Sequence, residues 1–140
     1  MFRELSKRHG LAFTHQRQVI YRALLAARDH PTPEAVYDIV REQIPSLSLG
    51  TVYKNVKTFL GAGMLREVSL HHGPLRLDAN LHQHHHLVCR VCRSIGDLED
   101  SDFEPARFTG RLPKGFRVDR QIVEIIGICA SCAKKQSSTS

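Results

Sequence analysis

Four cysteines arranged in two pairs constrain this chain more than any other feature of its sequence. Each pair has two residues between its cysteines, Cys89-x-x-Cys92 and Cys129-x-x-Cys132. That spacing lets both sulfurs of a pair turn toward one point, and two pairs supply a tetrahedral set of thiolates about 2.3 Å from a Zn²⁺ ion. Four protein ligands leave no open coordination position, so the pattern predicts a structural zinc. Free buried thiols and a redox-active CxxC are the alternatives.

The sequence offers no segment that would take the chain into or across a membrane. No apolar run approaches the roughly 20 residues that a membrane helix needs. The first ten residues, MFRELSKRHG, lack the apolar core of a signal peptide. We therefore expect a cytoplasmic protein without a membrane partner. Disulfides are rare in that reducing compartment, so the paired cysteines favour metal binding.

Positive charge is concentrated in the first part of the chain. The formal net charge is +6 with neutral histidines, and the pI is about 9.5. Residues 1–80 hold 11 Lys and Arg against 7 Asp and Glu, whereas residues 81–140 hold 9 against 7. Zinc-bound thiolates would lower the charge of the second part further. A basic first part suits an acidic partner such as nucleic acid.

Three helices are predicted before residue 64. The first follows the candidate N-cap Thr14, and apolar residues then recur with the spacing of one helix face. The second begins at Thr32-Pro33, a capping hydroxyl followed by proline at the first helical position, and stops near Pro45. The third starts near Ser48 and ends at Gly61-Ala62-Gly63.

The third helix has two chemically different faces. Its expected inner face is apolar and consists of Val52, Val56, Phe59 and Leu60. Its expected outer face is polar and consists of Thr51, Tyr53, Lys54, Asn55, Lys57 and Thr58. Such side chains can contact phosphates, and Thr51 and Tyr53 can touch a thymine methyl group. Arg17, near the start of the first helix, is a further phosphate candidate. An ordinary solvated helix face is the alternative.

Two short segments after the third helix complete a recognisable layout. Leu65–Leu70 and Leu75–Asp78 predict a small hairpin. Helices joined by short turns and followed by a hairpin are typical of a winged helix-turn-helix. A boundary near Asn80–His82 divides the chain into a winged-helix DNA-binding domain, residues 1–80, and a dimerisation and metal-binding domain, residues 81–140. The fold class expected for the whole chain is α+β.

The second part contains short strands around the cysteine pairs. Leu87–Cys89 and the region of Ile95 predict strands on either side of the first CxxC turn. Residues 98–112 are polar and are interpreted as a helix. The β-branched run Phe116–Ile128 predicts one long strand leading into the second CxxC. The tail Lys134–Ser140 is expected to be frayed.

A histidine cluster, His82-Gln83-His84-His85-His86, precedes the first cysteine. On a strand, His84 and His86 point to one side and His85 to the other. Asp78 lies shortly upstream and Asp97 shortly downstream. A nitrogen and carboxylate ligand set suits Fe²⁺, Mn²⁺ or Zn²⁺ better than Cu⁺. A solvated histidine-rich loop, or an adventitious nickel-binding run, is the alternative.

Together these motifs resemble the ferric uptake regulator (Fur) family. The likeness runs from about Gly10 to Cys132 and rests on His30-Pro31-Thr32, Ser48-Leu49-Gly50-Thr51-Val52-Tyr53, His84-x-His86-x-x-Cys89-x-x-Cys92 and Gly127-x-Cys129-x-x-Cys132. The resemblance implies an N-terminal winged helix that binds DNA and a C-terminal α+β domain that forms a homodimer. It also implies a regulatory metal between the domains, which fits the dimer to a palindromic, A·T-rich operator and usually represses transcription.

Carried over by position, the resemblance implies the regulatory ligands His30, Asp78, His84, His86 and Asp97. Iron- and zinc-sensing members usually have Glu where this chain has Asp78 and Asp97. Two aspartates with three histidines resemble the peroxide-sensing PerR branch, in which bound Fe²⁺ reacts with peroxide and a ligand histidine is oxidised. The matching oxidation targets are His30 and His84. The implied cofactors are structural Zn²⁺ and regulatory Fe²⁺ or Mn²⁺.

Three other functions stay open from the sequence. One is an iron, manganese or zinc homeostasis repressor of the same family. Another is a metallohydrolase that uses the His and Asp residues, although no general base stands apart from the five ligands. The last is a zinc-ribbon interaction module without a DNA role, which the basic first part and the lysine-bearing third helix disfavour.

Overall fold

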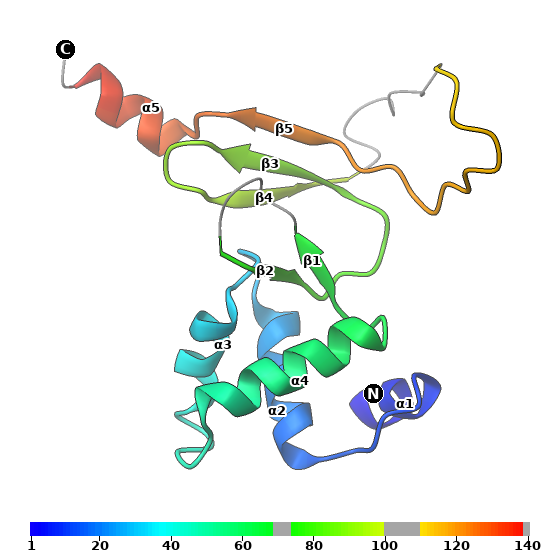
Figure 1. Cartoon of the computed structure of the whole chain (residues 1–140). Coiled ribbons are helices and arrows are strands. Elements are labelled where there is room, and N and C mark those ends of the chain that lie inside the picture. Colours follow the sequence, from blue (N-terminus) through cyan, green and yellow to red (C-terminus); the bar gives the residue numbers. More distant parts are fainter. Residues whose placement is uncertain (69–73, 100–109, 139–140) are drawn as a thin grey trace. The chain divides into compact units, whose positions relative to one another are not determined.

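The computed structural model describes residues 1–68, 74–99 and 110–138 (Figure 1). The chain divides into two compact units, Met1–Leu81 and His82–Ser140, here termed the N-terminal and C-terminal units. Among the described residues, no helix is both long and apolar enough to cross a bilayer.

Helices make up most of the N-terminal unit. They are α1 (Phe2–Arg8), α2 (His15–Ala26), α3 (Pro33–Val40) and α4 (Leu49–Gly61). The side-chain oxygens of Thr14, Thr32 and Ser48 each accept a backbone N–H three residues on, at 3.1–3.2 Å. These caps confirm the three predicted helix starts. Helix α1 was not predicted from the sequence. Helix α3 ends at Val40, and hydrogen-bonded turns continue from there toward Pro45.

One face of each helix contributes to a single hydrophobic core. Phe59, Val52 and Val56 of α4 are fully buried, as predicted, and Phe59 lies edge-on to Tyr21 with ring centroids 5.3 Å apart. Phe2 joins this aromatic cluster from α1. One face of α4 therefore packs into the core, and its opposite face is open to a partner.

A two-stranded hairpin follows α4. Gly63, with φ of +77°, takes the left-handed conformation that ends the helix and turns the chain toward β1 (Arg66–Val68). β1 pairs antiparallel with β2 (Arg76–Asp78), with Arg66 opposite Asp78. The predicted hairpin is confirmed, and with α2, α3 and α4 it forms a winged helix-turn-helix.

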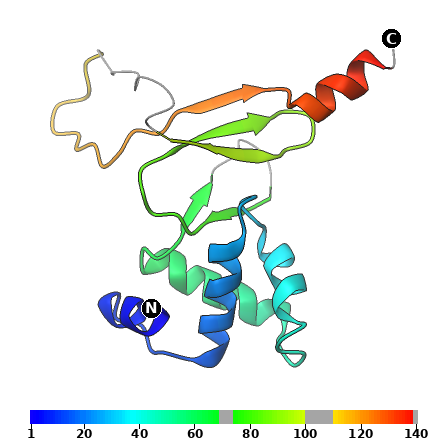
Figure 2. The same ribbon diagram turned by 180° about the vertical axis from the view of Figure 1, so that it is seen from behind.

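The C-terminal unit is a three-stranded sheet followed by a helix. Its strands, β3 (His85–Cys89), β4 (Ile95–Leu98) and β5 (Glu124–Gly127), have the order β4-β3-β5 (Figure 2). β4 is antiparallel to β3 and β5 is parallel to it. Helix α5 (Ala130–Ser137) begins directly after β5. The α+β fold class and the strands around the first CxxC are confirmed.

Two predictions for the C-terminal unit are wrong, and a third falls mainly outside the described residues. The long strand over 116–128 is wrong, because β3 is short and pairs with only four residues of β5, from Glu124 to Gly127. The frayed tail is wrong as far as Ser137, because α5 continues to that residue. The helix predicted over 98–112 falls mainly on residues 100–109, which lie outside the described part of the chain; among its described residues, Leu98 ends β4 and residues 99 and 110–112 are not helical.

Candidate metal centres and nucleic-acid interface

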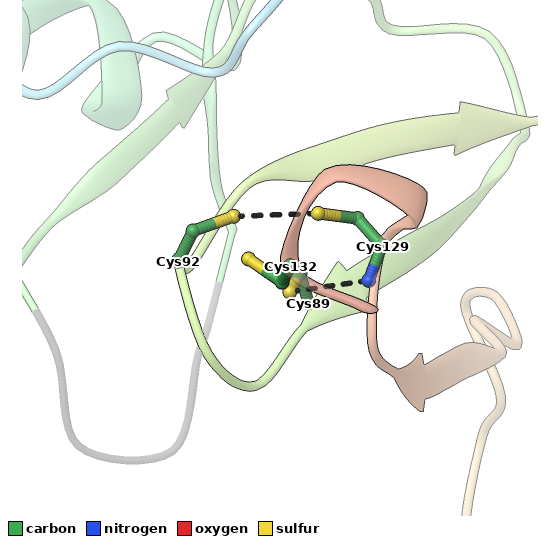
Figure 3. A group of neighbouring side chains, drawn as sticks. All are labelled: Cys89, Cys92, Cys129 and Cys132. Carbon is green, nitrogen blue, oxygen red and sulfur yellow. Dashed lines mark hydrogen bonds between the residues drawn. The ribbon is translucent and has the colours of Figure 1, made fainter. Parts of the chain in front are cut away.

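The four cysteines meet at one end of the β3–β5 ladder (Figure 3). Cys89 ends β3 and Cys92 lies in the following turn, while Cys129 caps α5 and Cys132 lies in its first turn. Because Cys89 is in register with Gly127, the parallel pairing brings the second CxxC beside the first. All four sulfurs lie within 4.8 Å of one another.

The spacing of the sulfurs fits a tetrahedral metal. Ligands about 2.3 Å from a central zinc stand about 3.8 Å apart, and Cys92 Sγ and Cys129 Sγ are separated by 3.8 Å. A disulfide would need about 2.05 Å, and all four cysteines are free. The donor set and its geometry are thus those of a closed, structural zinc site.

Hydrogen bonds already prepare part of this cluster for ionisation. The backbone N–H of Cys129 donates to Cys89 Sγ at 3.3 Å, and it and the N–H of Cys92 lower the pKa of Cys89 to about 6. Contact with the Ser94 side chain lowers the pKa of Cys92. By contrast, the neighbouring Cys129 sulfur, followed by burial, raises the pKa of Cys132 to about 12. Four adjacent thiols resist complete ionisation, and a bound divalent cation would reverse that resistance.

A histidine and an aspartate lie together in the N-terminal unit. His30 Nδ1 is 3.6 Å from Asp78 Oδ2, and both residues are buried. Backbone contacts hold His30 there: its carbonyl accepts from the Arg76 guanidinium, and Leu77 N–H donates to Pro31 O at 3.0 Å. His30 has φ of +54°, an uncommon conformation for a residue other than glycine. The chain thus sustains local strain where it presents this imidazole.

Two histidines and an aspartate lie together in the C-terminal unit. The β3–β4 register places Asp97 opposite His86. Asp97 Oδ1 is 3.5 Å from His84 Nε2 and 3.8 Å from His86 Nε2, and the two imidazole rings are 4.8 Å apart. His84 Nδ1 donates to the carbonyl of His82 at 2.7 Å, which assigns the ring lone pair to Nε2. A backbone bond of this kind orients an imidazole for metal binding.

His85 points to the other side of β3, as predicted. Its Nδ1 accepts a hydrogen bond from Val123 N–H at 2.9 Å, which ties β3 to the residue before β5. His84, His85 and His86 are all buried, so the alternative of a solvated histidine-rich loop is wrong for them. The alternation of the strand therefore separates one structural histidine from two potential ligands.

The predicted DNA-contacting residues of α4 do not all lie on its surface. Tyr53, Lys54 and Lys57 are exposed and Thr51 is half-buried, but Asn55 is only 8% exposed. The expectation that Asn55 lies on the outer face is wrong. With Val52, Val56 and Phe59 it completes the i, i+3, i+4, i+7 stripe of the buried face, a periodicity that could have placed it correctly.

Arg17 and Tyr53 have partners within the N-terminal unit. Arg17 Nε donates to Asn55 Oδ1 at 3.2 Å, and its Nη1 donates to Ala12 O at 2.9 Å. The Tyr53 hydroxyl donates to the carboxylate of Glu34, the second residue of α3. That hydrogen bond lowers the pKa of Glu34 and raises the pKa of Tyr53. Glu34 was not predicted from the sequence, where its only signal was an acidic residue in the first turn of α3.

Comparisons with known proteins agree with these features. Residues 8–125 match the sequence model of the ferric uptake regulator family. The peroxide-responsive repressor PerR of Staphylococcus aureus strain Mu50 is 30% identical over 126 residues, 90% of this chain and 85% of that protein. PerR of Staphylococcus epidermidis is 29% identical over 129 residues, 92% of this chain and 86% of that protein.

The fold is also similar to that of solved structures. A zinc-bound manganese uptake regulator superposes with a TM-score of 0.66 at 26% identity, covering 91% of this chain and 97% of that one. Proteins of this kind are metal-responsive, DNA-binding, dimeric regulators of transcription and not enzymes, which sets the metallohydrolase alternative aside. The matched span and these relatives together show that the chain belongs to the ferric uptake regulator family.

Proposed function

We propose that this chain is a homodimeric repressor whose binding to A·T-rich palindromic DNA depends on a regulatory metal and is abolished by peroxide. The observation that carries the proposal is the pair of preformed half-sites, His30 with Asp78 and His84 with His86 and Asp97. Each half-site offers too few ligands for a firmly held transition metal. A single ion taking all five would link the DNA-binding unit to the dimerisation unit.

The length of the connecting segment supports one shared metal. Asp78 and His84 are six positions apart. Even a fully extended chain advances at most about 3.6 Å per residue, so their Cα atoms cannot be more than about 22 Å apart. Binding at one half-site therefore keeps the other within easy reach, as in any short-linker bivalent system. Three imidazoles and two carboxylates suit Fe²⁺ or Mn²⁺.

A structural Zn²⁺ on Cys89, Cys92, Cys129 and Cys132 is part of the same proposal. It would be held by four thiolates and would supply folding energy to the C-terminal unit. The cluster geometry and the absence of disulfides support it.

DNA binding is proposed for the exposed face of α4. Tyr53, Lys54 and Lys57 are directed away from the core of a unit whose sequence is basic. Lysines exposed on a recognition helix can bind DNA phosphates, and a tyrosine can contact base edges or methyl groups. Two such helices in a symmetric dimer would match the two halves of a palindrome.

The edge of the C-terminal sheet supports self-association. β5 pairs with β3 on one side only within the described residues, and its Ile125 and Ile126 are exposed, Ile126 at 59%. Phe116 and Val118, upstream of the strand, are also exposed. An unprotected apolar edge strand invites a second chain, and a twofold partner would bury it.

Peroxide sensing is proposed because the relatives named above are peroxide-responsive repressors and because the carboxylate ligands here are aspartates. Bound Fe²⁺ would supply the redox chemistry that activates peroxide. Five ligands that each bind through one atom leave a position open for it. His30 and His84 are the proposed oxidation targets. A manganese, iron or zinc homeostasis repressor is the second candidate, favoured by the likeness to the manganese uptake regulator.

One experiment separates these functions. The full chain is loaded anaerobically with Fe²⁺ or with Mn²⁺, exposed to a small excess of hydrogen peroxide, and then titrated onto an A·T-rich palindromic duplex. We expect the iron form to lose DNA binding and to gain one oxygen on His30 or His84 by mass spectrometry, while the manganese form is unchanged. An iron form that survives without histidine oxidation would favour metal homeostasis. A protein that binds no duplex in either form would refute the DNA-binding function itself.

A further inference from the structure

Asn55 is a polar residue on the buried face of the helix proposed to read DNA, and its amide is engaged at both ends. Asn55 Oδ1 accepts from Arg17 Nε at 3.2 Å, and Asn55 Nδ2 donates to the Thr51 carbonyl at 2.9 Å. The amide has thus exchanged solvent for two partners in the same unit. Because Asn55 is only 8% exposed and points toward the interior of the unit, its amide is poorly placed to reach a base edge.

Arg17 extends this connection to the segment before α2. Its Nη1 donates to Ala12 O at 2.9 Å, while its backbone N–H is the one capped by Thr14. Arg17 therefore touches three places at once: the 12–14 segment, the start of α2 and the second turn of α4. In Figures 1 and 2, α2 and α4 cross within the N-terminal unit, and the Arg17–Asn55 hydrogen bond joins the start of α2 to the middle of α4; we term this contact the polar bridge.

The bridge continues to the first turn of α4. Thr51, whose carbonyl receives the Asn55 amide, shares a hydroxyl contact of 2.9 Å with the N-cap Ser48. Tyr53, Lys54 and Lys57 lie in the second and third turns of the same helix and are exposed. The bridge and the proposed DNA-contacting side chains thus occupy opposite faces of one short helical segment.

We propose that Arg17 and Asn55 are positioning residues that hold α4 for sequence recognition, and that they contribute to specificity through the helix and not through contacts of their own with DNA. The inference rests on the proposed DNA binding by α4. It revises the expectation for Arg17, because the guanidinium uses Nε and Nη1 within the protein. It also explains why a polar residue, Asn55, lies on the buried face of α4, where it accepts the hydrogen bond from Arg17.

Recognition of bases depends on position more than attraction to phosphates does. Hydrogen bonds to base edges weaken steeply with misalignment, whereas a lysine on a flexible stem can follow a displaced phosphate. A loosened helix should therefore lose binding to its preferred sequence first and keep most of its general affinity for DNA. The ratio of specific to non-specific affinity reports positioning, and the salt dependence of binding reports phosphate contacts.

The test uses the full chain loaded with Zn²⁺ and Mn²⁺ and two duplexes of equal composition. One duplex is selected by the wild-type protein from a randomised A·T-rich pool, and the other is its scrambled form. Asn55→Ala and Arg17→Lys should lower the specific to non-specific ratio about tenfold, the size expected for one hydrogen bond to a charged group. The salt slope should not change. Asn55→Asp keeps the acceptor for Arg17 but loses the donor to the Thr51 carbonyl, so its ratio should lie between those of Asn55→Ala and the wild type.

Lys57→Ala is the matched control because Lys57 is exposed on the same helix. It should weaken binding to both duplexes equally and reduce the salt slope by about 0.9 per chain, which is about 1.8 for the dimer. The double variant Arg17→Lys/Asn55→Ala should be no worse than either single variant, since both break one bridge. Zinc content and thermal unfolding verify the fold of each protein.

Several results would overturn the inference. An unchanged ratio in Asn55→Ala, or strictly additive effects in the double variant, would show that the bridge does not position α4. A reduced salt slope with an unchanged ratio in Arg17→Lys would make Arg17 a phosphate contact. If Asn55→Ala does not fold, the ratio of specific to non-specific affinity in Arg17→Lys and Asn55→Asp tests the inference instead. A wild-type protein that binds neither duplex would instead refute the proposed function.

Discussion

Removing the metal from the cysteine cluster should unfold the C-terminal unit while the N-terminal unit stays folded. The two units differ sharply in their apolar interiors. Among the described residues of the N-terminal unit, fourteen buried side chains form its core. In the described part of the C-terminal unit, the buried apolar residues are Val88 and Ile95, together with the cysteines Cys89 and Cys132.

The size of each apolar interior determines how much folding free energy a unit has without the metal. Burial of one valine or isoleucine contributes about 1.5–3 kcal/mol, so Val88 and Ile95 together contribute about 3–6 kcal/mol. Binding of a structural zinc contributes about 10–16 kcal/mol at neutral pH. The metal is therefore the larger of the two contributions, and the sheet should not persist without it.

Hydrogen exchange read by mass spectrometry can follow both units in one sample. A strong chelator, or the substitution Cys89→Ser, should abolish amide protection in β3 and β5 and leave α2 and α4 protected. Arg90→Ser, in the same turn and exposed, is the control and should keep both zinc and protection. Persistent protection of β3 in zinc-free protein would refute the reasoning, as would simultaneous loss of protection in α4.

Further outcomes follow from the two half-sites and the sheet edge. His30→Ala should keep the zinc and the fold but lose Mn²⁺-stimulated DNA binding in a fluorescence anisotropy titration, and a normal response would remove His30 from the site. Asp97→Glu should keep metal-dependent DNA binding but blunt the peroxide response, because the longer carboxylate can bind through both oxygens; equal histidine oxidation in variant and wild type would contradict this. Ile126→Asp should shift the protein to monomer in sedimentation experiments, whereas Arg90→Ser, which also changes the charge by one unit but lies outside the sheet edge, should not.

Helix starts were predictable from sequence because their causes are local. Thr14, Thr32 and Ser48 each satisfy a backbone N–H three residues on, and that geometry depends on little else. The histidine alternation was predictable for the same reason, since the strand geometry alone separates His85 from its neighbours. The sequence motifs also indicated the family that the comparisons then showed.

Strand length was not predictable in this way. The β-branched run over 116–128 has strand propensity throughout, yet only the residues opposite β3 pair, from Glu124 onward. Strand propensity indicates that a segment can form a strand, and the length of the partner strand determines how many of its residues pair. Helix α5 shows the converse: Ala130, Ala133 and Lys134 favour a helix, but the polar composition of the tail obscured it.

Asn55 was misplaced for a different reason. Its amide suggested the polar face, although its position in the helical repeat assigns it to the buried one. The two indications conflict because a buried polar residue needs a partner, and here that partner is Arg17, 38 residues earlier in the chain. No local pattern identifies such a pair. Conflicts of this kind between residue type and periodicity are worth reading as signs of a buried polar contact.

The position of β3 connects the two candidate metal centres of the C-terminal unit. His86 and Cys89 lie three residues apart on one strand, a distance of about 10 Å. A zinc held by the four cysteines would fix the end of β3 and, through the β3–β5 pairing, the residue whose N–H binds His85. Loss of zinc would therefore release the strand that aligns His84 and His86, whereas loss of the regulatory metal leaves every cysteine contact in place. If the proposed function holds, this dependence runs one way, and the zinc would be a precondition of sensing and not the sensor.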